Sequence, residues 1–181
     1  MQAIDILMQE HRIIEKVLDS LETAANRLAA GEDVVPMEFF LQAADFIRNF
    51  ADGQHHQKEE GILFVALDEN GMAKDVEPVS VFMDEHEMAR AHTRGMIENA
   101  ERVKTGDASA KAQLVQHALD YVELLREHIQ KEDNILFPIA DNILDGQNQK
   151  LVADFKHADD ERQTGETYLR LAEELASAFG K

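Results

Sequence analysis

Apolar residues recur at every third or fourth position through most of this chain, which is the spacing of helices that bury one face. In the first such stretch the apolar positions are Ile4, Leu7, Ile14, Leu18, Leu21, Ala25 and Leu28. The series has one gap, where His11 stands, and it is followed by Gly31, a residue typical of helix ends. The pattern predicts a first helix up to about Gly31, with His11 directed toward the core.

The same spacing predicts three more long helices. The second runs from about Pro36 to Leu67, and the third begins at Pro78, because proline is well suited to the first turn of a helix. The fourth follows the break TGDASA, where Asp107 or Ser109 can cap the helix.

Polar residues interrupt the apolar faces of the third and fourth predicted helices. His86 takes such a position on the third, and His128 and Glu132 share one face of the fourth at heptad spacing. An imidazole or a carboxylate is costly to bury unless it finds a partner or a metal ion. These positions are therefore candidates for a site inside the helical assembly.

The chain also resembles itself at offsets of 75 and 73 residues. MQEHRIIEKV around His11 matches MDEHEMARAH around His86, and HHQKEEGILF from His55 matches HIQKEDNILF from His128. Two similar helical hairpins predict an antiparallel up-down four-helix bundle with pseudo-twofold symmetry, in which equivalent side chains converge on the axis. The predicted fold class is therefore all-α.

Length and composition agree with this fold. The 181 residues suit one domain, and three Pro, nine Gly and no Trp favour helices over hairpins. We predict that residues 1–144 form the bundle. After DGQNQ, residues 145–181 are predicted to form an additional C-terminal helix packed on the bundle.

Charge and cysteine content exclude several classes of partner and site. With 36 acidic and 18 basic residues the formal net charge is −18, so we expect neither nucleic acid nor a membrane as partner. The absence of Cys excludes disulfides, thiolate zinc sites, iron–sulfur clusters and thiol catalysis. The first residues lack a basic leader, and no stretch approaches the roughly 20 apolar residues of a membrane span. We expect a cytoplasmic protein whose metal ligands are nitrogen and oxygen atoms.

Each of the four predicted bundle helices supplies one histidine, and two of these histidines have a glutamate one turn later. That turn is about 6 Å along the same helical face. A histidine binds one ion terminally and a glutamate can bridge two, so facing His-x-x-x-Glu units suit a dinuclear site completed by hydroxide, water or a small diatomic ligand. The predicted metal ligands are His11, His55, Glu59, His86, His128 and Glu132.

These motifs resemble the hemerythrin-like HHE cation-binding domain family over about residues 1–144. The resemblance implies a four-helix bundle with a non-haem di-iron centre held by the six residues just named. One position departs from the oxygen-carrying members, which place a further His on helix three where this chain has Arg90. Their fourth-helix carboxylate comes five residues after the His, and at that place this chain has Asp133, beside Glu132. The pattern is closer to the branch associated with iron sensing, nitrosative-stress repair or peroxide chemistry.

Helix two contains two overlapping pairs with identical spacing, His55 with Glu59 and His56 with Glu60. We expect only one pair to face the axis. The internal repeat favours His55 and Glu59, whereas a helical wheel places His56 nearer the apolar side of the helix. We follow the repeat, which leaves His56 and Glu60 to orient a ligand by hydrogen bonding or to line an entry path.

Other polar residues are secondary candidates. Glu15 lies one turn after His11 and is either a further ligand or a partner of Arg90. Tyr121 is expected in the core, with a hydroxyl that can approach the site. The histidines predicted to have no metal role are His92, His117 and His157.

Several functions remain open for such a site. Two iron ions are expected, with Mn or Zn as alternatives, because imidazole and carboxylate bind all three. One hypothesis is a protein that senses or reacts with O₂, NO or peroxide, or that handles iron. The alternatives are a di-iron redox enzyme of the peroxide-reducing, NO-reducing or ferroxidase type, and a reversible O₂ carrier. Because Arg90 replaces a nitrogen ligand, we expect one ion to be more open to external ligands.

Overall fold

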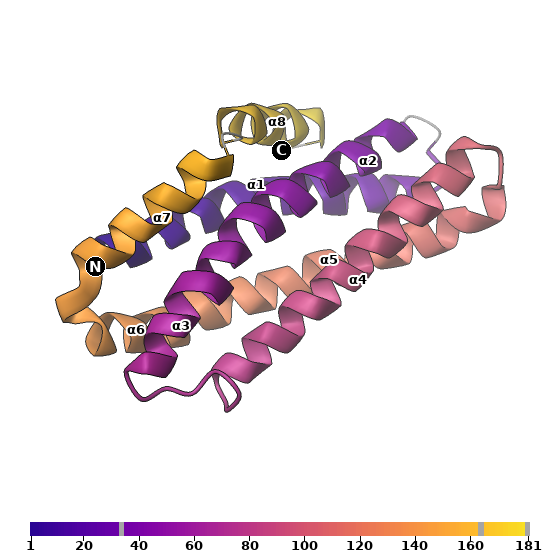
Figure 1. The fold of residues 1–181 in the computed structure, drawn as a ribbon. Coiled ribbons are helices and arrows are strands. Elements are labelled where there is room, and N and C mark those ends of the chain that lie inside the picture. Colours follow the sequence, from indigo (N-terminus) through magenta and orange to yellow (C-terminus); the bar gives the residue numbers. More distant parts are fainter. Residues whose placement is uncertain (33–34, 163–164, 180–181) are drawn as a thin grey trace.

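The computed structural model describes residues 1–32, 35–162 and 165–179, and the regular structure in these ranges is helical throughout, which confirms the all-α prediction. Four long helical rods pack side by side (Figure 1). The second and fourth rods each join α-helical and π-helical segments. The bounds are α1 Gln2–Ala29; α2 Met37–Phe46, η1 Ile47–His56, η2 Glu59–Leu63 and α3 Phe64–Glu69; α4 Val79–Lys104; η3 Ala108–Ala110; and α5 Lys111–Lys131, η4 Glu132–Leu136 and α6 Phe137–Ile143. None of the helices in these ranges is long and apolar enough to cross a membrane.

The rods begin and end close to their predicted positions, for local reasons visible in the sequence. α1 ends shortly before Gly31, whose backbone φ of +78° is readily adopted only by glycine. Pro36 and Pro78 directly precede α2 and α4. Before α5, the carboxylate of Asp107 accepts a hydrogen bond of 3.1 Å from the backbone N–H of Ser109.

Two apolar cores fill the bundle, and a polar layer separates them. Along α1, Leu7 belongs to one core and Ile14 to the other, with the buried His11 between them. Large side chains of the two cores include Phe40, Phe46, Phe50 and Tyr121 in the first and Phe64, Phe82, Phe137 and Phe155 in the second. Apolar packing on both sides holds the rods in register and shields the polar layer from water.

Two helices make up the predicted C-terminal addition: α7 (Asn148–Arg162), which follows the short turn η5 (Asp145–Gln147), and α8 (Gly165–Phe179). Glycine has a low helix propensity, and Gly165 begins α8. Residues 163–164 and 180–181 of the predicted addition lie outside the described ranges.

Both C-terminal helices lie outside the four rods and are anchored by apolar contacts (Figure 1). Leu151 and Phe155 of α7 belong to the core at one end of the bundle. Ala172 and Leu175 of α8 belong to the core at the other end. The addition therefore covers both cores from one side.

Candidate metal centre

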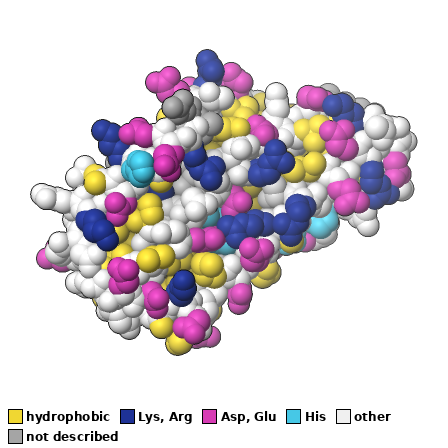
Figure 2. All heavy atoms as spheres, viewed as in Figure 1, with side chains coloured by type: hydrophobic (Ala, Val, Ile, Leu, Met, Phe, Trp, Pro, Cys, Tyr) yellow, Lys and Arg dark blue, Asp and Glu magenta, His cyan; other side chains and the backbone are white. Residues whose placement is uncertain are grey.

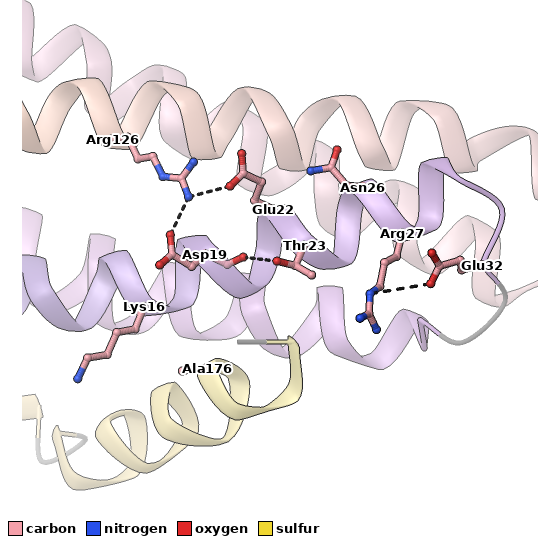
Figure 3. A pocket seen from close by; sticks show the side chains of 9 residues that line it. All are labelled: Lys16, Asp19, Glu22, Thr23, Asn26, Arg27, Glu32, Arg126 and Ala176. Atoms are coloured by element: carbon pink, nitrogen blue, oxygen red, sulfur yellow. Dashed lines mark hydrogen bonds and ion pairs between the residues drawn. The ribbon is translucent and has the colours of Figure 1, made fainter. Parts of the chain in front are cut away.

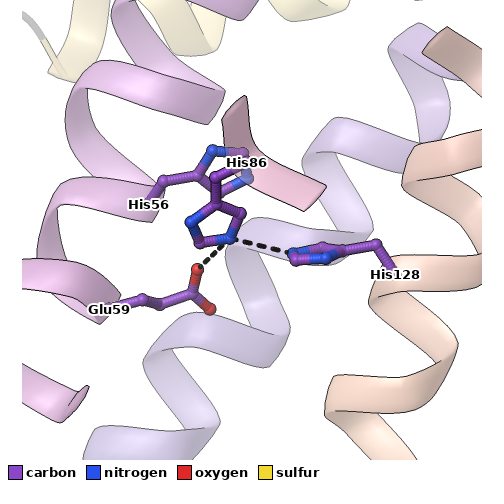
Figure 4. Close-up of side chains that lie close together, drawn as sticks. All are labelled: His56, Glu59, His86 and His128. Atoms are coloured by element: carbon purple, nitrogen blue, oxygen red, sulfur yellow. Dashed lines mark hydrogen bonds and ion pairs between the residues drawn. The ribbon is translucent and has the colours of Figure 1, made fainter. Parts of the chain in front are cut away.

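Among the described residues, five histidines and two glutamates converge in the polar layer between the cores. Their donor atoms form two groups, and the atoms of each group lie within 4.8 Å of one another. The first group is His11, His55, Glu59 and Glu132, and the second group, drawn in Figure 4, is His56, Glu59, His86 and His128. Every one of these side chains is at most 1% exposed. The structure thus brings together the six predicted ligands and adds His56.

The two glutamates lie between the groups, and each glutamate contacts one imidazole of the first group and one imidazole of the second. The distances from carboxylate oxygen to Nε2 are 3.3 Å from Glu59 to His55, 3.5 Å from Glu59 to His86, 3.2 Å from Glu132 to His11 and 3.3 Å from Glu132 to His128. A carboxylate that serves two ions must occupy such an intermediate position.

His56 reaches the centre because the second rod is π-helical where it passes the site. The expectation that only one of the two overlapping pairs faces the axis does not hold for the histidines, since His55 and His56 are both buried there. A π-helix has a wider turn than the 3.6 residues of an α-helix, so two consecutive side chains can face the same interior. The His56 ring stacks on that of His86, with centroids 3.8 Å apart. Glu60 stays outside both groups.

The two halves of the repeat share one π-helical segment and differ in another. η2 begins at Glu59, and η4 begins at its repeat equivalent, Glu132. η1, which ends at His56, has no counterpart in the fourth rod, because that rod is α-helical up to Lys131. The residue equivalent to His56 is Ile129, which packs in an apolar core. A fifth imidazole is therefore present on one side of the centre only.

Each imidazole of the centre has a carboxylate at its outward nitrogen, Nδ1. Four of these contacts are hydrogen bonds of 2.7–3.0 Å, and in the fifth, at His56, the separation is 3.5 Å. The pairs are His11 with Asp133, His55 with Glu10, His86 with Glu60, His128 with Glu85, and His56 with Asp52. A proton held on Nδ1 leaves the lone pair of Nε2 directed at the centre, which is the tautomer that a metal ion requires.

Sequence reasoning missed three of these outer carboxylates, Glu10, Asp52 and Glu85. Glu10 and Glu85 precede the histidines of MQEH and MDEH, so the repeated Glu-His dipeptide was a signal that could have found them. Glu60 and Asp133, which the sequence offered as secondary candidates, are also repeat equivalents and take equivalent outer positions. Asp52 has no such signal.

Basic side chains contact the outer carboxylates in turn. The pairs are Lys58 with Glu10, Lys131 with Glu85, Arg12 with Asp133, and Arg90 with both Asp52 and Glu60. Burial raises the pKa of Glu10, but His55 and Lys58 outweigh burial and hold that pKa below its usual value. Arg90 thus belongs to the layer of charged side chains outside the imidazoles, where it pairs with two of the outer carboxylates. Glu15 pairs with Arg12 at 3.0 Å rather than with Arg90, and it belongs to neither donor group.

Many inward-facing atoms of the centre lack a hydrogen bond, although several of them contact one another. The atoms without a hydrogen bond among the described residues include Nε2 of His11, His55 and His56 and both carboxylate oxygens of Glu59 and Glu132. Unpartnered polar atoms at this depth cost on the order of 1–3 kcal/mol each, and native proteins contain few of them. Imidazole nitrogens and shared carboxylates are also the donor set that suits a pair of iron, manganese or zinc ions. The residues present therefore fit metal ions.

The raised pKa values of two histidines also indicate that the centre favours additional positive charge. Burial lowers the pKa of His55, but the carboxylates of Glu59 and Glu10 outweigh burial and raise that pKa to about 10. The pKa of His128 is likewise raised to about 10, against burial, chiefly by Glu132. Without another cation the carboxylates thus draw protons onto these two imidazoles, whereas burial lowers the pKa of His56 and of His86. A metal ion can take the place of the protons on His55 and His128.

The remaining sequence candidates lie outside the centre. Tyr121 is fully buried in an apolar core, and its hydroxyl has no partner among the described residues. His92 and His117 face each other from α4 and α5, with Nδ1 atoms 3.4 Å apart. His157 is exposed on α7, near Glu161. None of these histidines belongs to either donor group.

Comparison with known proteins agrees with this geometry. Residues 2–140 match the Hemerythrin HHE cation binding domain. The uncharacterized proteins Rv1995 of Mycobacterium tuberculosis and Mb2018 of Mycobacterium bovis are each 26% identical to this chain over 160 residues, which cover 88% of this chain. The chain spans 62% of the length of these relatives. No solved structure gives a significant match.

The family match covers nearly the whole bundle, including both helical hairpins of the repeat. It also covers every residue of the two donor groups, from His11 to Glu132. The chain therefore belongs to the hemerythrin HHE cation-binding domain family.

Proposed function

We propose that this protein binds two iron ions in the buried centre and uses them to sense or react with a small molecule such as O₂, NO or peroxide. The observation that supports this most directly is the pair of buried donor groups that share Glu59. In this proposal His11 and His55 hold one ion, His56, His86 and His128 hold the other, and Glu59 and Glu132 are shared. When bound, two irons supply redox chemistry and coordination positions for the small molecule.

The chain's own residues orient the donors and limit the access of water. The outer carboxylates keep the protons of the imidazoles on Nδ1, and Lys58 behind Glu10 favours the ionised form of that carboxylate. The apolar cores close the polar layer on both sides along the bundle. Reactivity at the centre then depends on which small molecules can reach it.

A cavity beside the centre supports such access. It has a volume of about 320 Å³, lies between η1, α4 and α5, and has His56 in its wall. A purely structural metal site needs no such opening. The cavity therefore favours a reactive or sensing role over a structural one.

A reversible oxygen carrier is a second candidate, and His56 favours it. The expectation of an exposed ion was based on Arg90, which stands where oxygen carriers supply a further His. In the structure His56 contributes an imidazole on the same side as His86 and His128, and Arg90 lies in the outer layer. The centre therefore has five imidazoles within the described ranges, and the reasoning that left one ion short of a nitrogen no longer applies.

Metal analysis and optical spectroscopy test both candidates. Protein purified without oxygen should contain close to two irons per chain, and spectra should be recorded under argon, in air, after NO and after the return to argon. Oxidation in air that argon does not reverse supports sensing or reaction. A band that appears with O₂ and disappears over repeated cycles supports the carrier. One ion per chain, or none after addition of Fe²⁺, would overturn the dinuclear proposal.

A further inference from the structure

The cavity beside the centre has the size and wall of a small-molecule pocket. Its volume of about 320 Å³ lies at the lower end of the range for ligand pockets, roughly 300–1,000 Å³. Ile47, Ala89 and Ile97 provide apolar wall, and His56, which is 1% exposed, lies at its inner side. The proposed function uses this cavity for access and uses His56, Asp52 and Arg90 around the metal centre, so Tyr121, Arg48 and Arg94 have no role in it.

Tyr121 lines this cavity, and its buried hydroxyl is an unused hydrogen-bond donor. Tyr121 lines the cavity and is fully buried, and no described residue bonds its hydroxyl. Burial raises the pKa of Tyr121, and the negative charge of Asp52 adds to the effect, so the hydroxyl stays protonated. Because an unpartnered buried donor is costly, the hydroxyl is best explained by an acceptor that the chain itself does not supply.

Basic side chains surround the outer part of the cavity. Figure 2 shows Lys and Arg side chains gathered over the surface between α2 and α4, and the arginines that line the cavity are Arg48, Arg90 and Arg94. Arg90 is neutralised by neighbouring carboxylates. Arg48 has only a 3.9 Å contact with Asp45, and Arg94 forms no ion pair within the described ranges. On a chain with a net charge of −18, the unpaired Arg94 and the weakly paired Arg48 at the mouth of an apolar cavity indicate an anionic ligand.

We propose that this cavity binds a small organic monocarboxylate with a compact, aromatic-sized apolar body. The carboxylate faces Arg94 and Arg48 at the mouth, the apolar body lies between Ile47 and Ile97, and a polar atom at the inner end accepts a hydrogen bond from Tyr121. The ligand then lies against the wall that contains His56 without binding metal. The inference goes beyond the proposed function and does not depend on it.

The chain contains two tyrosines and no tryptophan, so tyrosine is a selective reporter of this cavity. Fluorine NMR of protein labelled with fluorotyrosine should show two signals, and Tyr168→Phe assigns them. Titration with 4-hydroxybenzoate should shift the Tyr121 signal saturably, with a Kd of about 1 mM, and leave the Tyr168 signal in place. The titration is made on chelator-treated protein and on protein treated with diamagnetic Zn²⁺, so that it can be read whether or not metal binds.

Matched variants and a neutral analogue test the two polar contacts. Arg94→Gln should weaken binding of 4-hydroxybenzoate about tenfold and remove its preference over 4-hydroxybenzamide. Tyr121→Phe, measured by calorimetry, should weaken binding severalfold without loss of thermal stability, because it removes an unpartnered hydroxyl. The control is Arg126→Gln, since Arg126 lies in a separate surface groove of about 700 Å³, paired with Asp19 and Glu22 (Figure 3).

Three results would overturn the inference: no saturable shift at Tyr121, equal affinity for the acid and the amide, or unchanged affinity in Arg94→Gln. A protein that binds the acid as expected but takes up no metal would contradict the proposed function and leave this inference intact.

Discussion

The two halves of the internal repeat place the same types of residue around the metal centre, which we call the symmetric framework. They differ on one side of the centre, at the wall that borders the cavity. In each half a glutamate on one helix is hydrogen-bonded to a histidine on the next helix, and a lysine three residues after that histidine contacts the same glutamate. The three residues are Glu10, His55 and Lys58 in one half and Glu85, His128 and Lys131 in the other. The halves differ at His56 and Asp52, whose repeat equivalents, Ile129 and Leu125, are buried in an apolar core.

This difference separates two properties of the bundle. The symmetric framework follows from the spacing of residues along the helices. The number of donor side chains that face the centre depends instead on the π-helical segment of one rod. The segment η1 brings in His56 and also supplies Ile47 and Asp52 to the cavity wall. The second half stays α-helical there and fills the same space with apolar side chains. In the proposed function, the symmetric framework holds the ions and the asymmetric wall is the side from which small molecules approach.

The largest effect is expected where the halves meet, at Glu59, because Glu59 belongs to both donor groups. Glu59→Ala should lose both ions and lower the free energy of unfolding of the metal-loaded protein by about 3 kcal/mol or more, since metal binding no longer adds to folding. Elemental analysis and chemical denaturation measure the two effects. Glu15→Ala is the control and should keep both ions, because Glu15 belongs to neither donor group. Two ions in Glu59→Ala would show that the carboxylate is not shared.

An intermediate effect is expected at the positions where the halves differ. His56→Ala should lower the metal content from two ions to one. Ile129→Ala, at the equivalent position, should keep both ions, although the cavity it leaves in the core costs about 2–5 kcal/mol of stability. Metal analysis of the two variants measures the contrast. If His56→Ala retained two ions, the fifth imidazole would not be a ligand and the difference between the halves would have no chemical meaning.

The smallest effect concerns α7, which contacts the lysine of one half only. Lys58 is fully buried and lies 2.8 Å from Asp159 of α7, whereas Lys131 is 36% exposed. Asp159→Asn should lower the stability by about 1 kcal/mol or less, because the pair is partly solvated. Thermal denaturation measures it, with the exposed neighbour in Asp160→Asn as control. Equal shifts in the two variants would mean that α7 does not support the first half in particular.

The predicted ligands could be found from sequence because burying a polar residue interrupts a regular apolar pattern. His11, His86 and His128 each stand where the helical spacing expects an apolar side chain. His56 could not be found in this way, because pattern analysis assumes α-helical geometry and no single residue type specifies π-helical hydrogen bonding. The helical wheel placed His56 near the apolar side of its helix, but the prediction followed the internal repeat, which favoured His55.

The outer layer was harder to predict, because its contacts join residues from different helices. Glu10 is adjacent to His11 in sequence but bonds to His55, so local spacing gives no hint of its partner. The C-terminal segment was predicted as one additional helix. Its division into α7 and α8 was not predicted, since one glycine in a helical pattern is only a weak sign of a break.

The burial of the donor atoms also affects how fast a bound ion can exchange with the surroundings. Because each donor side chain is at most 1% exposed, an ion can leave only when the rods move apart locally. Exchange of the ions with the surroundings is then governed by how often the bundle opens, and tight binding is not needed to make it slow. Ions acquired while the chain folds would stay in place through periods when free metal is scarce.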